Sequence, residues 1–299
     1  MAVRTRAAVL VLIATILWGF IGVPVRGLSE AGLDSIQING ARTVVTAILL
    51  LVLLLAMDRS LFRIRREELP FMLVAAVMKL LMDICYVQAQ VTLSLSLAAV
   101  LLSTGCYFTI FLSFFLFRSS LTWKKIVASV IGFAGCAFVV GVLSGDIGDI
   151  DTVGVLIGLG AALAGAFYSI SMKMGMDRGS HPTSVLFYVF LFGSFMILPF
   201  MDPVGTFSTV SSGLDTFGIL MLLAVMFTLV PYYCYTKGLK DLDPTTVNIL
   251  LFTETAAAAV AGLLVYGEML TFIDIVGLAM ILLSVSMVDR RDGDVRTPR

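Results

Sequence analysis

The chain alternates between long runs of apolar residues and short polar gaps. Ten of the runs are about 20 residues long, and an α-helix of that length spans the ~30 Å hydrocarbon core of a bilayer. We therefore predict an all-α polytopic membrane protein with ten transmembrane helices. The predicted spans are Ala7–Val25, Ile36–Met57, Leu69–Ala89, Leu95–Phe117, Trp123–Leu143, Val153–Met174, Pro182–Phe200, Phe217–Tyr235, Thr245–Tyr266 and Phe272–Val288.

The basic residues are sorted between alternate gaps. Of the 20 Lys and Arg, only Arg26, Arg42 and Lys79 fall outside the two tails and the borders and gaps after the second, fourth, sixth and eighth spans. The other gaps contain the acids Asp146, Asp149, Asp151, Asp202 and Asp215. Cytoplasmic loops are the ones that keep an excess of Lys and Arg. We therefore expect a multi-pass protein of the cell (inner or plasma) membrane, with the N- and C-termini in the cytoplasm.

Composition agrees with this class. Hydrophobic residues make up 59% of the chain, charged residues 13%, and the mean hydropathy is +1.04. The formal net charge of zero says nothing about partners, because the charges are sorted by side of the membrane rather than by amount. A basic groove with interleaved aromatic residues is absent, so we expect no nucleic-acid partner. The four cysteines lie in apolar runs without metal-ligand spacing. They are predicted to be packing residues, and we expect no metal and no cofactor.

A weak internal repeat divides the chain near its middle. Cys85-Tyr86 followed by Leu101–Thr104 recurs as Cys234-Tyr235 followed by Leu250–Thr253, at an offset of 149 residues. Five spans in each half make the second half enter the membrane in the opposite direction. Such inverted repeats place a substrate site between the halves near the midplane of the membrane. The predicted units are a first five-helix repeat (1–146), a second five-helix repeat (147–288) and a polar cytoplasmic tail (289–299).

These spans also carry a family resemblance. Residues that resemble the first half of an EamA-type transporter are Leu17-Trp18-Gly19, Ala41-Arg42 and the stretch from Ala98 to Leu121-Thr122. Those that resemble the second half are Thr253-Glu254-Thr255, Gly267-Glu268 and Gly277. EamA proteins belong to the drug/metabolite transporter (DMT) superfamily. The resemblance implies ten helices in two inverted halves, and metabolite efflux.

The chain departs from the family pattern at three positions. Cys106 and Thr255 stand near the places in the fourth and ninth spans where family members usually carry a proline. A glutamate is usual just before the Leu-Thr pair of each half; Glu268 supplies it in the second half, but Ser119 occupies the matching place in the first. These residues therefore give no reason to expect proline kinks in those two spans.

Four ionisable residues, Arg42, Lys79, Asp83 and Glu254, lie within the predicted spans. Such residues are costly inside the membrane and indicate function by default. Lys79 and Asp83 are four residues apart, on one helix face that Tyr86 extends. In one interpretation the two charges neutralise each other and only make membrane insertion tolerable. In the other, Lys79 binds an anionic group of the solute such as a carboxylate, and Asp83 either holds Lys79 in place or faces an amine. We favour the second interpretation, because leucine would pack at less cost.

Glu254 is predicted to lie near the middle of the ninth span. A lone carboxyl group there suits proton coupling, because a proton and a cationic substrate can compete for its charge. We therefore assign proton coupling to Glu254 and Asp83; the alternative for Glu254 is a structural salt bridge to Arg42 or Lys79. Arg42, with Asn39 one turn earlier, either binds an anionic group or bonds helix-end carbonyls.

Aromatic residues within the spans complete the candidate substrate site. Tyr and Trp buried in a membrane protein usually need hydrogen-bond partners. We expect Trp18, Tyr107, Tyr168 and Tyr232 to line a cavity, the alternative being core packing or contact with lipid.

Small residues spaced four apart predict close helix packing within the chain, and a monomer or weak homodimer. They are Gly132, Cys136, Gly154, Gly158 and Ala162. His181, the one histidine, is predicted to be a solvated loop residue.

The function predicted first is secondary active transport of a small organic metabolite, such as an amino acid or a related amphipathic solute, by alternating access with proton coupling. Export is implied by the family resemblance. Its expected partners are the small-molecule substrate, protons and membrane lipid. The sequence contains no Walker-type loop, so ATP is not expected to drive it directly.

Three alternatives differ in their requirements. An exchanger or importer of phosphorylated or nucleotide-sugar solutes would use Arg42 and Lys79 as an anion clamp. A flippase subunit for lipid-linked precursors would depend little on Glu254. An intramembrane enzyme would need a nucleophile–base pair or a metal set, and the spans contain no histidine and no HExxH motif. We therefore predict that the protein is not an enzyme.

Overall fold

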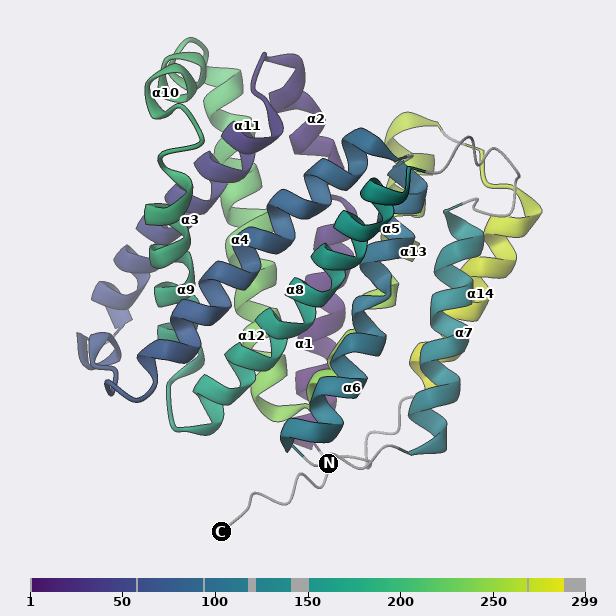
Figure 1. Cartoon of the computed structure of the whole chain (residues 1–299). Coiled ribbons are helices and arrows are strands. Elements are labelled where there is room, and N and C mark those ends of the chain that lie inside the picture. The colour runs from purple at the N-terminus through teal and green to yellow at the C-terminus, as the bar shows by residue number, and fades with distance from the viewer. Residues whose placement is uncertain are drawn as a thin grey trace.

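The computed structural model describes residues 2–57, 59–93, 95–117, 122–140, 151–267 and 269–287, and within these ranges the chain is helical without a strand (Figure 1). The elements are α1 (Ala2–Gly19), α2 (Gly22–Glu30), α3 (Ser35–Met57), the 3₁₀-helix η1 (Arg59–Phe62), α4 (Leu69–Thr92), α5 (Leu95–Ser103), α6 (Gly105–Phe117), α7 (Trp123–Val139), α8 (Thr152–Asp177), α9 (Pro182–Ile197), α10 (Pro203–Ser211), α11 (Leu214–Ala224), the π-helix η3 (Val225–Leu229), α12 (Val230–Asp241), α13 (Pro244–Tyr266) and α14 (Phe272–Met287).

Each of the ten predicted spans contains helix. Seven helical stretches of the described residues are long and apolar enough to cross a membrane, and α9 and α14 are shorter apolar helices. Large apolar side chains such as Phe115, Phe195 and Leu264 remain exposed. An exterior of this kind faces lipid rather than water. The prediction of an all-α polytopic membrane protein is confirmed.

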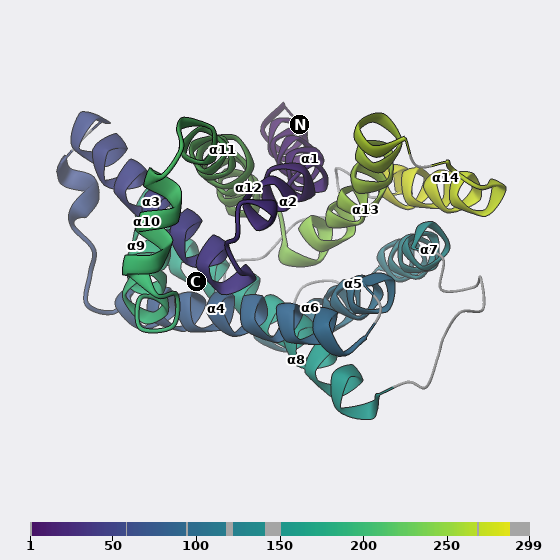
Figure 2. The ribbon, with the colours of Figure 1, turned by 90° about the horizontal axis from the view of Figure 1, so that it is seen from above.

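The helices pair in a pattern that repeats between the two halves. The third span, α4, packs along the sixth, α8, as the eighth, α12, packs along the first, α1. Likewise α6 of the fourth span packs on α8, and α13 of the ninth on α1. The fifth and tenth spans, α7 and α14, pack on each other at one edge of the molecule (Figure 2). Each of these contacts has a counterpart when the first five spans are exchanged for the last five.

Several residues used above lie outside the described part of the chain. They are Ser119, Leu121, Leu143, Asp146, Asp149, Glu268, Val288 and the tail 289–299. The predicted boundary between residues 146 and 147 is among these residues, so the division into units remains a prediction.

The small residues are points of close contact within the chain. A side chain at Gly154 would lie 2.6 Å from Thr92, and one at Gly158 would lie 2.8 Å from Leu101. One at Gly132 would lie 2.6 Å from the hydroxyl of Ser284. Because none of these positions has room for a Cβ atom, the predicted close packing within the chain is confirmed.

Two spans predicted as single helices are interrupted in the middle. The first breaks at Phe20 and Ile21, between α1 and α2. The fourth breaks at Thr104, whose hydroxyl donates to the carbonyl of Leu101 (2.6 Å) and so competes with the helical hydrogen bonds. The fourth span is therefore broken without a proline, whereas α13, around Thr255, is continuous.

The eighth span contains a π-helical turn that the sequence analysis did not predict. Pro231 lacks an N–H group, and its ring crowds the carbonyl of Phe227 one turn earlier. The chain accommodates this with the wider turn Val225–Leu229, where the hydroxyl of Thr228 donates to the carbonyl of Leu223 (2.9 Å). π-helical turns are frequent at functional sites. This one directly precedes Tyr232.

Two polar connections are more structured than predicted. The gap between the seventh and eighth spans contains the short helix α10, for which Asp202 accepts from the backbone N–H of Gly205. His181 is not merely a solvated loop residue, because its Nδ1 atom accepts from the N–H of Thr183 and caps α9. Burial, together with Lys237 and Lys240, lowers the pKa of His181 and keeps the imidazole in the neutral form that this cap requires.

Candidate functional site

Three of the four predicted intramembrane charges form one cluster. Nζ of Lys79 donates to Oδ2 of Asp83 at 2.8 Å, as the i, i+4 spacing on α4 predicts. Nη2 of Arg42, on α3, lies 3.9 Å from the same oxygen. The side chains of Lys79, Asp83 and Arg42 are only 5%, 12% and 12% exposed. Two cations thus share one carboxylate, and the cluster carries one surplus positive charge.

Aromatic rings from the second half cover this charge cluster. Nζ of Lys79 lies 5.3 Å from the ring centre of Phe190 on α9 and 5.4 Å from that of Tyr232 on α12. Trp18 of α1, in the first half, packs edge-on against the ring of Tyr232 at 4.9 Å and in a tilted orientation against that of Tyr235 at 5.6 Å. Ring faces attract cations, so these contacts help to compensate the buried charge of Lys79.

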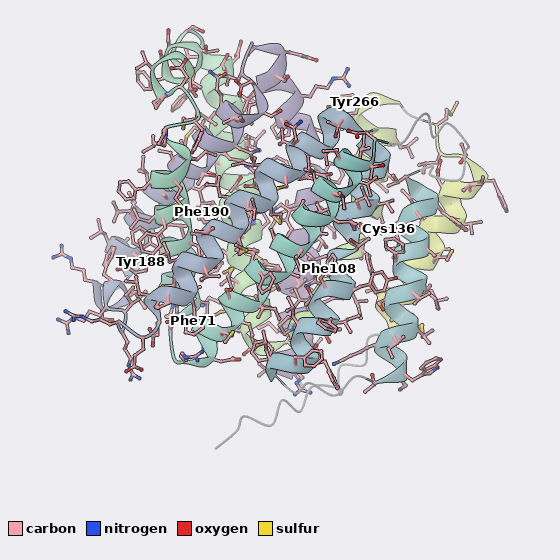
Figure 3. All side chains as sticks on the ribbon, viewed as in Figure 1. Phe71, Phe108, Cys136, Tyr188, Phe190 and Tyr266 are labelled. Carbon is pink, nitrogen blue, oxygen red and sulfur yellow. The ribbon has the colours of Figure 1, made fainter. Side chains whose placement is uncertain are left out.

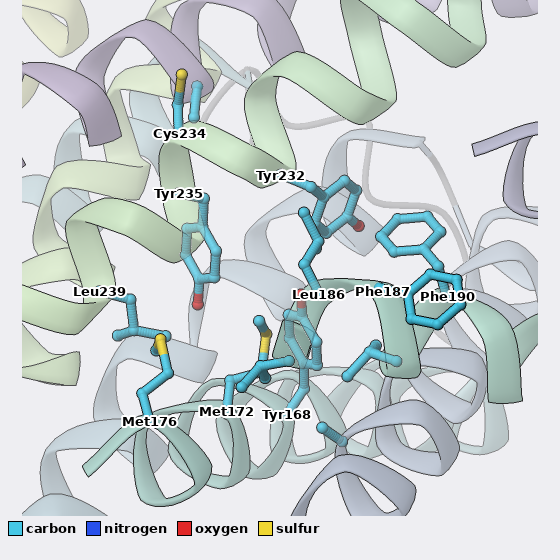
Figure 4. Packing of buried hydrophobic residues seen from close by; sticks show 14 of the residues in the cluster. Tyr168, Met172, Met176, Leu186, Phe187, Phe190, Tyr232, Cys234, Tyr235 and Leu239 are labelled. Atoms are coloured by element: carbon cyan, nitrogen blue, oxygen red, sulfur yellow. The ribbon is translucent and has the colours of Figure 1, made fainter. Parts of the chain in front are cut away.

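Tyr168 and Glu254 complete the assembly. Tyr168 on α8 is buried, with its ring 6.3 Å from and nearly parallel to that of Tyr235, and it is within electrostatic reach of Asp83 (Figure 4). Glu254 on α13 is partly buried and within electrostatic reach of Tyr232. The described residues include no ion pair from Glu254 to Arg42 or Lys79, so the structure does not contain the salt bridge considered as its alternative role.

The assembly lies at mid-depth between the two halves. Lys79 is ten residues into α4 and Glu254 ten residues into α13, or about 15 Å from the start of each helix at 1.5 Å per residue. Phe190 also lies at middle height in the bundle, whereas Tyr266 lies near its upper end (Figure 3). The first half contributes Trp18, Arg42, Lys79 and Asp83, and the second half contributes Tyr168, Phe190, Tyr232 and Glu254.

Three other predicted site residues have different surroundings. The hydroxyl of Tyr107 donates to the carbonyl of Ser129 (3.3 Å) and its ring packs on Phe133, so its described contacts are with α7 rather than with the charge cluster. Asn39 is partly buried one turn before Arg42, and Tyr86 is partly buried one turn after Asp83. We retain Asn39 and Tyr86 as flanking residues of the proposed site and leave Tyr107 out.

Comparison with known proteins decides the family. The sequence matches the EamA-like transporter family over residues 5–141 and 152–289, which is nearly the whole chain in two parts. The chain belongs to the EamA-like transporter family. The prediction from the sequence motifs is confirmed, and the family comprises transporters rather than enzymes.

Relatives agree with this assignment without naming a common solute. An uncharacterized transporter of Clostridium kluyveri is 22% identical over 222 residues, which cover 73% of this chain and 71% of the relative. The threonine/homoserine exporter RhtA of Salmonella typhimurium is 30% identical over 144 residues, 47% of this chain and 46% of that protein. A solved crystal structure superposes with a TM-score of 0.81 over 98% of this chain and 100% of its own, at 14% identity, which supports the fold alone.

One buried ion pair of this EamA chain was missed by the sequence analysis. Lys125 in the first turn of α7 was counted only as one of the basic residues that indicate topology. It is 5% exposed, and its Nζ lies 3.3 Å from Oδ2 of Asp243, which precedes α13. Asp243 also caps α13 by accepting from the N–H of Thr246 at 3.1 Å. The local sequence indicated only that Asp243, followed by a proline, could cap a helix. It could not indicate that Asp243 pairs with Lys125, because the two residues are 118 positions apart.

We expect Lys125→Met to lower the free energy of unfolding by about 3–5 kcal/mol, because it leaves the carboxylate of Asp243 buried without its cation. Asp243→Asn should cost a similar amount while keeping an N-cap. The double variant should regain most of the loss, as measured by thermal unfolding of the purified proteins. A single variant that unfolds like the wild type would show that the pair contributes little.

Proposed function

We propose that this protein is a secondary active exporter of small organic metabolites, namely amino acids or related amphipathic solutes, working by alternating access. The observation that supports this best is the cluster of Arg42, Lys79 and Asp83 at mid-depth, covered by rings from the opposite half. A site between inverted halves can be opened to either side of the membrane when the halves exchange conformations.

The chemistry of the cluster matches a zwitterion with an apolar part. Only Nη2 of Arg42 approaches Asp83, so the guanidinium has further N–H groups that could donate to a solute. The surplus positive charge of the cluster favours the carboxylate of the solute. An ammonium group would be attracted to Asp83 or Glu254. The apolar part of the solute would contact the rings of Trp18 and Tyr232.

The direction and setting of transport are part of the same proposal. Export agrees with the name of the relative RhtA, a threonine/homoserine exporter. The sorting of Lys and Arg favours the cell (inner or plasma) membrane with both termini in the cytoplasm. The partners proposed are the solute, protons and lipid, for a monomer or weak homodimer.

Glu254 is the group proposed to exchange protons for solute. It lies near the middle of α13, and no ion pair between Glu254 and another described residue is present. A carboxyl group without a cation partner can accept a proton when the solute leaves and release it when a cationic solute arrives. Asp83, in contrast, is already committed to Lys79 and Arg42, so its main role is to organise the binding cluster.

Variants at these two carboxyl groups test the coupling. In proteoliposomes with an acidic interior, the wild type should accumulate the solute against its gradient. Glu254→Gln should lose this accumulation but retain exchange of labelled for unlabelled solute, because Arg42, Lys79 and Asp83 remain to bind the solute. Adding Asp83→Asn should abolish the exchange as well. Full accumulation driven by the pH gradient in the double variant would refute the coupling.

Glu30 provides the matched control for this experiment. It is an exposed carboxylate near the end of α2 that pairs with Arg26 at 3.4 Å, away from the charge cluster. Glu30→Gln should therefore transport like the wild type. A comparable loss in Glu30→Gln would mean that the assay responds to charge removal in general.

A second candidate function, exchange or import of phosphorylated or nucleotide-sugar solutes, has one observation in its favour. Arg42 and Lys79 lie together at Asp83 rather than in separate spaces, as an anion clamp requires. However, Asp83 neutralises one of the two charges. If sugar phosphates compete with the labelled solute more strongly than amino acids do, the second candidate replaces the first.

A further inference from the structure

The hydroxyl group of Tyr168 is buried without a hydrogen-bond partner. Tyr168 is 5% exposed, and its hydroxyl is one of four buried side-chain oxygens of the described residues that lack a partner. The other three belong to Thr109, Ser113 and Thr183. Leaving such a group unsatisfied is unfavourable, so each native example needs an explanation.

Tyr168 differs from the other three in what it can reach. Thr109 and Ser113 lie within α6, where a hydroxyl can rotate toward the carbonyl one turn earlier and satisfy itself. Thr183 lies in the first turn of α9, next to the cap His181 and outside the charge cluster. The hydroxyl of a tyrosine lies at the far end of a rigid ring and cannot reach its own helix backbone. Its partner must therefore come from another helix or from a ligand.

The surroundings of Tyr168 place this hydroxyl at the proposed substrate site. Its hydroxyl end points away from α8 toward Tyr232 (Figure 4). Tyr168 is within electrostatic reach of Tyr232 and Asp83, which contact Lys79. The neighbouring Tyr235 already donates to Oγ of Ser169 at 3.1 Å. Within this group of rings, the hydroxyl of Tyr168 is thus a buried polar atom left without a protein partner.

We infer that the hydroxyl of Tyr168 determines specificity by hydrogen bonding to a neutral polar group of the solute, so that the transporter prefers hydroxylated amino acids to aliphatic ones of the same shape. The inference rests on the proposed function and adds the class of side chain. The charge cluster holds the ionic end of the solute, and Tyr168 contacts the hydroxyl further along it. An aliphatic solute would leave the hydroxyl of Tyr168 unsatisfied, and its binding would be weaker for that reason.

An isosteric pair of amino acids tests this directly. Threonine and valine have nearly the same shape, and threonine has a hydroxyl where valine has a methyl group. In proteoliposomes containing the wild type, threonine should compete with labelled solute about tenfold better than valine, the effect of one neutral hydrogen bond. Tyr168→Phe should bring the ratio close to one, mainly by weakening the competition from threonine.

Two controls separate specificity from a structural role. Tyr168→Phe should unfold at the same or a higher temperature than the wild type, because the hydroxyl it removes has no protein partner. Tyr235→Phe is the matched variant: it removes the hydrogen bond to Ser169, so it should unfold at a lower temperature but retain the wild-type ratio.

The outcomes distinguish this inference from the proposed function. A wild-type ratio near one, or an unchanged ratio in Tyr168→Phe, would overturn the role of Tyr168 and leave amino acid export standing. If the wild type transports no amino acid of either kind, both proposals fail.

Discussion

Replacing Asp83 with asparagine is expected to abolish transport and to lower the free energy of unfolding by about 3–5 kcal/mol. The carboxylate is the shared partner of Lys79 at 2.8 Å and Arg42 at 3.9 Å, and all three side chains are largely buried. Removing it leaves two like charges close together in a region of low dielectric constant, which is the costly way to break a buried pair. Unfolding of the purified variant in detergent and solute exchange in proteoliposomes measure the two effects.

The double variant Lys79→Met with Asp83→Asn separates the two interpretations of this pair. Removing both charges together should restore most of the lost stability, because it removes the repulsion between Lys79 and Arg42 and leaves one surplus positive charge, as in the wild type. Transport should stay absent if Lys79 binds the anionic group of the solute. If the double variant recovers both stability and transport, the pair only makes insertion tolerable, and the solute binds elsewhere.

Gly19→Ala is expected to have the second largest effect, with a loss of about 1–3 kcal/mol in stability and of most transport activity. A Cβ atom at position 19 would meet the side chain of Ala257 and lie 2.7 Å from the backbone nitrogen of Ala258 on α13. A backbone cannot move aside as a flexible side chain can, so α1 and α13 would separate. Trp18 and Glu254 are on these two helices, and their positions in the site would change.

Gly160→Ala is the matched control for this packing prediction. Gly160 lies within α8, and a Cβ atom there would meet no atom within 4 Å. Since alanine favours a helix over glycine, this variant should be as stable as the wild type or more stable by about 0.5–1 kcal/mol. Should Gly19→Ala behave like Gly160→Ala in thermal unfolding and transport, close approach of α1 and α13 is not required.

Parts of the proposed site follow from local sequence because its geometry is set within one helix. The contact between Lys79 and Asp83 results from their spacing of four residues, and the structure contains it. Residue type also indicated Tyr168 and Tyr232, since both are large polar aromatic residues inside apolar runs. What the chain alone did not show is that Arg42 shares the carboxylate of Asp83, because no spacing rule relates α3 to α4.

The sequence by itself determined the membrane class and the position of the spans. Ile36–Met57 was predicted where α3 runs from Ser35 to Met57, and Thr245–Tyr266 where α13 runs from Pro244 to Tyr266. Membrane class and span position follow from consecutive residues alone. A helix in lipid must make all its backbone hydrogen bonds within itself and must be long enough to cross the hydrocarbon core.

Only the tertiary structure decided the interruptions and the long-range partners. Thr104 and Pro231 stand in the sequence, but their presence alone does not show whether the helix continues past them, breaks or widens into the π-helical turn at 225–229. An apolar run has the same hydrophobic pattern in each case. The pairing of Lys125 with Asp243 and the missing partner of Tyr168 depend on residues far along the chain. Periodicity and charge sorting describe neighbours in sequence, whereas a site between two halves is made of neighbours in space.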